Sequence, residues 1–248
     1  MKKAAFLSIG LISILILFTI FSTESGIKIK EQTQNENLPD FAQIAEEAAN
    51  DLQKYIRIKT IRGNEIESAN FLKEILEKNG IETKFISYPG KPDRTSLIAE
   101  LPGIEDGGGI IFMNHMDVVE AEAAEWKYPP FNGVRIEDKI YGRGAVDMKG
   151  LKHSEPATIS PMDSKFFKTI AATAIKVVPG AVVTPFLSPG TTDSSYFRMN
   201  GFKCYGLIPA LLTDMELDGI HGKNESIRVI HLKTGIQILF ETILNYNK

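Results

Sequence analysis

A histidine and an aspartate, His115 and Asp117, are separated by a single residue in the segment Met113–Val119. In an extended strand, side chains two positions apart point to the same side, so this pair can lie together, with the imidazole as a metal ligand and the carboxylate orienting it. A His-x-Asp pattern also arises often by chance, and the alternative is a histidine that simply ends a strand with its hydrogen bonds satisfied. The pair alone leaves both interpretations open.

Further blocks of the same kind follow along the chain. They are Trp126–Gly133 (WKYPPFNG), Tyr141–Gly150 (YGRGAVDMKG), Ser160–Asp163 (SPMD), Gly190–Phe197 (GTTDSSYF) and His221–Glu225 (HGKNE). Each block is only loosely specific, but five matches in a fixed order multiply their weight.

In this order the blocks resemble the zinc metallopeptidase family that contains acetylornithine deacetylase, succinyl-diaminopimelate desuccinylase, aminoacylase and glutamate carboxypeptidase. The resemblance extends from Phe41 to the C-terminus. It implies an α/β fold, a mixed twisted sheet flanked by helices in a zinc-exopeptidase-like catalytic domain. It also implies zinc-dependent hydrolysis of amide or peptide bonds in small peptides or N-acyl amino acids, of the metallo-carboxypeptidase or amidohydrolase type.

The resemblance gives a role to each matching residue. His115 would bind one zinc ion, His221 the other, and Asp147 would bridge the two. Asp117 would be the catalytic residue that orients His115. Two zinc ions that share a carboxylate can bind a water, lower its pKa toward about 7 and polarise the carbonyl that it attacks.

These assignments have structural alternatives. An acidic residue after glycines, such as Asp147, is commonly a helix cap, and His221 would otherwise be an exposed loop histidine; in both cases the surrounding block favours the ligand. For Gly190, Thr192 and Asp193 the resemblance implies substrate binding, whereas the alternative is a glycine turn that caps the next helix. Both interpretations need the same residues, so the sequence does not separate them.

One part of the family pattern is missing. In the family, the block that ends here at Gly150 leads through further strands to a pair of glutamates, another acidic ligand and a lid domain used for dimerisation. In this chain Gly150 runs directly into Leu151, and Pro156 and Pro161 prevent a continuous helix across the junction. We therefore expect a catalytic domain that lacks interior elements and the lid.

The missing part bears on activity. The general-base glutamate has no counterpart, and each zinc ion would have two protein ligands, fewer than the roughly three of a catalytic zinc site. Loss of a general base typically costs about 10² to 10⁴ in rate. Two hypotheses follow: a zinc hydrolase whose shortened chain is weakly active or inactive, and a catalytically inactive membrane-tethered remnant with weak or no metal binding.

Composition restricts the classes of partner that the chain can bind. The chain has 248 residues, 43% of them hydrophobic, and can bury a sizeable core. Its net charge of -3 argues against nucleic acid as a partner and leaves open small anionic or zwitterionic substrates. The resemblance implies a small peptide or N-acyl amino acid as the substrate. The single cysteine, Cys204, excludes an internal disulfide. His153 and His231 match no ligand position and are expected at the surface.

The N-terminus predicts export. Lys2 and Lys3 precede an uncharged run over residues 4–23, which as a helix would span about 30 Å, the thickness of a bilayer core. We expect residues 1–24 to be a signal peptide or N-terminal membrane anchor, followed by a polar tether over 25–40. The protein would then be secreted, periplasmic or membrane-anchored, facing outside the cytoplasm.

Elements that would position these residues follow from the spacing of apolar side chains. Helical spacing predicts helices over 41–55, 71–76 with Gly80 as a cap, 167–175 with Asp163 as N-cap, 192–199 and 236–244. Strands are expected over 82–87, 96–101, 109–119, 181–186 and 204–208. The catalytic domain would comprise an N-terminal half, 41–150, and a C-terminal half, 151–248. His115 would lie near the C-terminal end of a strand, where sites gather in α/β sheets.

Overall fold

The computed structural model describes residues 18–22, 38–61, 63–102, 109–146, 159–185 and 193–246. Three predicted site residues, Asp147, Gly190 and Thr192, lie outside these ranges.

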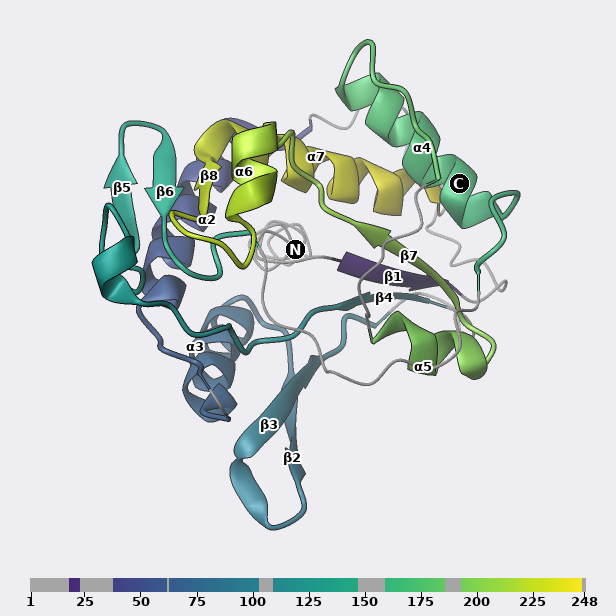
Figure 1. Ribbon diagram of the computed structural model, residues 1–248. Helices are drawn as coiled ribbons and strands as arrows, with labels where there is room; N and C mark the ends of the chain where they lie inside the picture. The colour runs from purple at the N-terminus through teal and green to yellow at the C-terminus, as the bar shows by residue number, and fades with distance from the viewer. Residues whose placement is uncertain are drawn as a thin grey trace.

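The fold is mixed α/β, as predicted, but its described strands form three small sheets rather than one (Figure 1). The elements are, in chain order, β1 (Phe18–Ser22), α2 (Phe41–Ile56), α3 (Glu65–Lys78), β2 (Thr83–Tyr88), β3 (Lys91–Ala99), β4 (Ile110–Met113), η1 (Ala123–Glu125), β5 (Val134–Ile136), β6 (Lys139–Tyr141), α4 (Lys165–Val177), α5 (Ser194–Met199), β7 (Lys203–Leu207), α6 (Asp214–Gly219), β8 (Ser226–Arg228) and α7 (Val229–Tyr246). The sheets have the orders β4-β1-β7, β2-β3 and β5-β6-β8, and all of their pairs are antiparallel.

Helices α2 and α3 confirm the predictions from apolar spacing. Asp40 is the N-cap of α2, because its Oδ1 accepts hydrogen bonds from the backbone N–H groups of Ala42 (2.9 Å) and Gln43 (3.1 Å). The apolar stripe of α2 is buried along its whole length. Helix α3 ends before Gly80, whose φ of +76° is a conformation that glycine adopts without strain.

The main core joins the two halves of the chain. Leu52 of α2 and Ile140 of β6 come from the N-terminal half, and Leu232 and Ile236 of α7 come from the C-terminal half; all four belong to one buried cluster. Helix α7 was predicted over 236–244 and is longer, since its buried stripe begins at Val229. The residues on either side of the predicted junction therefore fold around the same core.

A second apolar cluster covers one sheet. Phe166 and Ile170 of α4 and Leu239 and Tyr246 of α7 are buried together. Partly buried side chains of β4 and β7 pack against them, namely Ile110, Phe112, Tyr205 and Leu207. Alternate residues of each strand are involved, so α4 and α7 cover one face of the β4-β1-β7 sheet.

Strand β1 differs from the expected N-terminal helix. Residues 4–23 were predicted to form a signal or membrane anchor, whereas Phe18–Ser22 pairs with β4 on one side and β7 on the other. Aromatic and β-branched residues favour strands, which agrees with the sequence FTIFS. Residues 1–17 lie outside the described part of the chain. Within the described ranges, no helix combines the length and apolar character needed to cross a membrane.

Three local predictions were wrong. The N-cap of α4 is Ser164, not Asp163, because the Ser164 hydroxyl accepts a hydrogen bond from the Phe167 N–H (3.1 Å). Residues 181–185 form no strand, and Val182 is 83% exposed, so no buried face holds this segment in a sheet. Strand β4 ends at Met113 instead of continuing to Val119.

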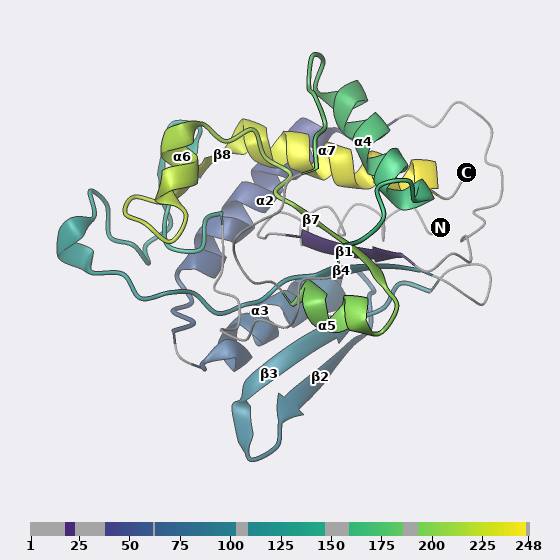
Figure 2. The ribbon, with the colours of Figure 1, turned by 45° about the vertical axis from the view of Figure 1, so that its right-hand side comes forward.

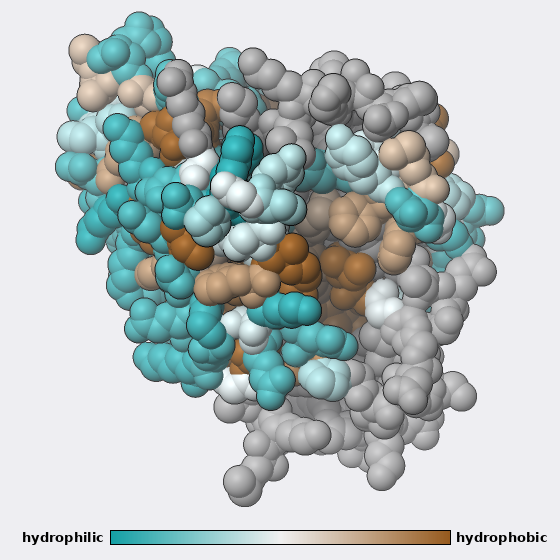
Figure 3. All heavy atoms as spheres, turned by 90° about the horizontal axis from the view of Figure 1, so that it is seen from below, coloured by the Kyte–Doolittle hydropathy of each residue, from teal (hydrophilic) through white to brown (hydrophobic). Residues whose placement is uncertain are grey.

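The β2–β3 hairpin projects from the body of the molecule in both ribbon views (Figures 1 and 2). Ile86 and Ile98 on this hairpin are 50% and 47% exposed. Seen from below, hydrophobic residues gather near the centre of the face, and largely hydrophilic residues lie to their left (Figure 3).

Candidate functional site

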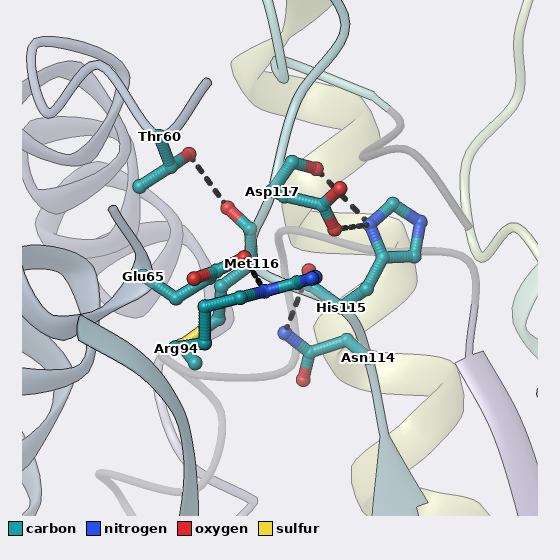
Figure 4. Close-up of polar contacts among 7 residues, drawn as sticks. All are labelled: Thr60, Glu65, Arg94, Asn114, His115, Met116 and Asp117. Atoms are coloured by element: carbon teal, nitrogen blue, oxygen red, sulfur yellow. Dashed lines mark hydrogen bonds and ion pairs between the residues drawn. The ribbon is translucent and has the colours of Figure 1, made fainter. Parts of the chain in front are cut away.

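His115 and Asp117 lie in the segment that follows β4. This segment is held by Thr60, which is buried just beyond α2. The Thr60 hydroxyl donates a hydrogen bond to the Met116 carbonyl (2.7 Å), and the Thr60 carbonyl accepts one from the Val118 N–H (3.1 Å; Figure 4 draws the first).

These bonds keep the alternation of an extended chain. Met116 and Val118 are buried in the main core, while His115 and Asp117, which alternate with them, are only partly buried. The sequence therefore predicted correctly that His115 and Asp117 lie together. The reason is a segment anchored by Thr60, not a continuous sheet strand.

The His115 ring is oriented by Asp117 (Figure 4). Its Nδ1 lies 3.1 Å from the backbone carbonyl of Asp117 and 3.6 Å from the Asp117 carboxylate. Both neighbours are acceptors, so Nδ1 carries the hydrogen in the neutral ring and the lone pair is on Nε2. In this arrangement a carboxylate fixes the tautomer and orientation of a histidine that binds a metal ion or accepts a proton. The side chains of His115 and Asp117 are 18% and 31% exposed.

Asp193 lies within electrostatic reach of this pair. Burial raises the pKa of its carboxyl, the positive potential of His115 lowers it, and the negative charge of Asp117 raises it, with a net upward shift. Asp193 stands at the N-cap position of α5, yet its side chain makes no capping hydrogen bond. The predicted role of Asp193 in substrate binding stays a prediction.

Glu65 and Arg94 lie next to the same segment (Figure 4). Glu65 begins α3 and is buried, and its Oε1 lies 3.7 Å from the Arg94 Nε on β3. The pair connects the β2–β3 hairpin to α3. Thr60, Glu65 and Arg94 belong to no motif and therefore received no predicted role.

In a second region, three sequence blocks come together around Arg143 and form an interlock. Its guanidinium lies over the Trp126 ring (5.0 Å to the centroid) and donates hydrogen bonds to the Gly222 carbonyl (2.5 Å) and to the Glu225 carboxylate (2.8 Å). The Arg143 N–H donates to the Pro130 carbonyl (2.7 Å). The WKYPPFNG, YGRG and HGKNE blocks thus form one structure. Arg143 is a structural donor, and the WKYPPFNG block braces it.

His221 lies in the loop between α6 and β8 and is exposed, with a left-handed φ of +57°. Asn224 of the same loop has the same φ, and its side chain accepts a hydrogen bond from the Lys127 N–H (2.7 Å). The loop is therefore docked on the WKYPPFNG block. The zinc-ligand role predicted for His221 stays a prediction.

The described residues do not make a zinc site. No group of three or more His, Cys, Asp or Glu side chains in the described ranges is arranged to hold a metal ion. His115, whose ring Asp117 orients, stays a predicted ligand, and the predicted bridging residue, Asp147, lies outside the described residues. His231, expected at the surface, is instead 9% exposed on α7, where the apolar stripe of that helix includes it.

The mixed α/β scaffold and the ordered blocks define a shortened catalytic domain of the zinc-exopeptidase-like class. The sequence profile of peptidase family M20/M25/M40 matches residues 111–152 and 151–245, more than half of the chain, and the chain belongs to this family. The two matches meet at residues 151 and 152, next to the junction expected between Gly150 and Leu151.

Two proteins named as desuccinylases are similar to part of this chain. The chain is 37% identical over 101 residues to a probable succinyl-diaminopimelate desuccinylase of Staphylococcus aureus (strain MRSA252), covering 40% of this chain and 24% of that protein. It is 37% identical over 102 residues to a succinyl-diaminopimelate desuccinylase of Orientia tsutsugamushi (strain Boryong), covering 40% of this chain and 25% of that protein. The matched region thus spans about a quarter of the length of these relatives.

Proposed function

We propose that this chain carries a reduced amide-hydrolase site for small N-acyl amino acids. The observation that carries the proposal is the His115 ring held through Nδ1 by Asp117 (3.1 and 3.6 Å), in a chain of the M20/M25/M40 family. Two similar proteins are named for removing a succinyl group from diaminopimelate, which is hydrolysis of an amide. N-succinyl-diaminopimelate is therefore the substrate with which to begin.

Hydrolysis by this chain should be slow. An amide carbonyl reacts only when a nucleophile is activated beside it, and the glutamates that do so in the family have no counterpart in this sequence. The missing general base alone lowers the rate by about 10² to 10⁴ relative to a complete enzyme. The described residues do not assemble the ligands of a zinc ion.

A second candidate function is a folded remnant without catalysis. The two matches to the family profile meet at residues 151 and 152, where this sequence lacks the glutamates that the resemblance leads us to expect. Such a remnant would keep the core shared by both halves and the interlock around Arg143, since neither requires a bound metal.

Hydrolysis of N-succinyl-diaminopimelate by the purified full chain distinguishes the two. The proposal predicts slow succinate release that Asp117→Asn lowers about 10- to 100-fold, the usual cost of losing the partner of a functional histidine. Asp51→Asn is the matched control, because Asp51 on α2 pairs with the exposed Lys54 (2.8 Å) and should leave the rate unchanged. No release above the uncatalysed rate, or equal rates for Asp117→Asn and the unchanged chain, would overturn the proposal.

A further inference from the structure

Glu225 is a fully buried carboxylate (0% exposed) whose oxygens both accept hydrogen bonds. Oε2 accepts from the Arg143 guanidinium (2.8 Å) and from the Gly144 N–H (3.2 Å). Oε1 accepts from the Val146 N–H (2.7 Å). A buried carboxylate with several charge-assisted hydrogen bonds fixes the geometry of its partners, because any movement leaves a charge unsatisfied.

The contacts of Glu225 fall on the segment that enters Asp147. Gly144 and Val146 are the third and first residues before Asp147, and the Gly142 N–H donates to the Glu225 backbone carbonyl (2.9 Å). Alternate amides of this segment are therefore bound to a single residue of the C-terminal half.

The same group restrains the loop of His221. Arg143, bound to Glu225, also donates to the Gly222 carbonyl (2.5 Å), one residue after His221. Gly222 has no room for a side chain, since a Cβ there would lie 2.5 Å from the Asp218 carbonyl. The loop is therefore packed tightly where Arg143 binds it.

We propose that Glu225 is a positioning residue that fixes the segment leading into Asp147 and the loop carrying His221 relative to one another. The proposal deepens the proposed function and rests on it, because it treats both segments as parts of one site. A merely stabilising residue would raise the stability of the whole fold, whereas a positioning residue orders these two segments specifically.

Glu225→Gln is the main test. The amide keeps the shape of the side chain but replaces an acceptor oxygen by a donor NH₂, so at least one of the three hydrogen bonds is lost. Glu241→Gln is the matched control: Glu241 is also buried (3% exposed) and bonded to a lysine, Lys176 (2.6 Å), but it lies on α7 away from both loops.

Two readouts do not depend on activity. Amide hydrogen exchange should rise about tenfold or more in residues 142–146 and in 219–224 of Glu225→Gln, with α2 unchanged. Trp126 is the only tryptophan of the chain and lies under Arg143, so its fluorescence emission should shift when Arg143 is released. Glu241→Gln should leave both signals as they are in the unchanged chain.

In Glu225→Gln, amide exchange that rises throughout the chain, or in only one of the two segments, would overturn the proposal. If Glu225→Gln does not fold, Arg143→Lys tests the same connection. It keeps the positive charge but removes the guanidinium fork, so we expect exchange to rise in 219–224 while Gly144 and Val146 stay protected by Glu225.

Hydrolysis is a separate readout. Where the full chain releases succinate, Glu225→Gln should lower kcat and Glu241→Gln should not. Where it releases none, the proposed function fails, and the exchange and fluorescence results still decide whether Glu225 couples the two segments.

Discussion

Gly133, the last residue of the WKYPPFNG block, is predicted to be required for packing this block on α2. Its φ is +55°, and a Cβ built on it would lie 2.5 Å from the backbone carbonyl oxygen of Gln53 and 2.9 Å from the Gln53 Cα. These are helix backbone atoms, so they cannot turn aside as a flexible side chain would. The Gln53 side chain also donates a hydrogen bond to the Gly133 carbonyl (2.8 Å), which fixes the approach.

Gly133→Ala therefore has two costs. A left-handed φ costs a residue with a Cβ about 1 to 2 kcal/mol, and forcing an added methyl group into a packed contact costs about 1 to 3 kcal/mol. Gly180→Ala separates them, because Gly180 has φ +85° but nothing within 4 Å of its would-be Cβ. We expect Gly133→Ala to lower the free energy of unfolding by about 2 to 5 kcal/mol in total, and Gly180→Ala by about 1 to 2.

Urea unfolding followed by far-UV circular dichroism measures both costs in the full chain. The slope of the free energy with urea should be the same in all three proteins, so that the midpoints compare directly. Equal midpoint shifts for the two variants would show that the block does not press on α2 as the structure describes.

Two further predictions concern the core. Burial lowers the pKa of His231, although the charge of Glu216 opposes this shift. Below the ordinary pKa of 6.5, the unfolded state therefore binds more protons than the folded state. The free energy of unfolding should fall with decreasing pH in this range, by at most about 1.4 kcal/mol per pH unit. His231→Gln should flatten this dependence in urea titrations at a series of pH values, and an unchanged slope would count against it. Leu52→Ala should cost about 2 to 5 kcal/mol, because Leu52 is 0% exposed in the core shared by both halves. Leu211→Ala, at a 50% exposed position, should change the unfolding free energy by less than about 0.5 kcal/mol, and similar costs for the two leucines would contradict the burial pattern.

Local patterns in the sequence predicted the helices well. The stripe from Phe41 to Tyr55 became α2, and the last helix was found, because the spacing of apolar residues is visible within a few turns. The short strands β5, β6 and β8 were missed, since each has only three residues and β6 pairs with β8, which is distant in the chain.

The candidate site was predictable in part. His115 and Asp117 stand in one motif, and their contact followed from it. The anchoring by Thr60 did not, because the hydrogen bond to Met116 joins residues 56 positions apart. Glu225 lay within the HGKNE block, and this block was the only signal for it; its partner Arg143 is 82 positions away, in another block. Side chains that pair over such distances are specified by the fold, not by local spacing.

The orientation of His115 is the basis of the proposed function, and the ring nitrogens report on it directly. The ¹⁵N chemical shifts of the histidine rings distinguish the two neutral tautomers, and a spectrum of His115→Gln identifies the signals of His115 among the four histidines. Because Nδ1 faces two acceptors of Asp117, the neutral ring should carry its hydrogen on Nδ1 and the lone pair on Nε2. A neutral His115 with its hydrogen on Nε2 would contradict the account.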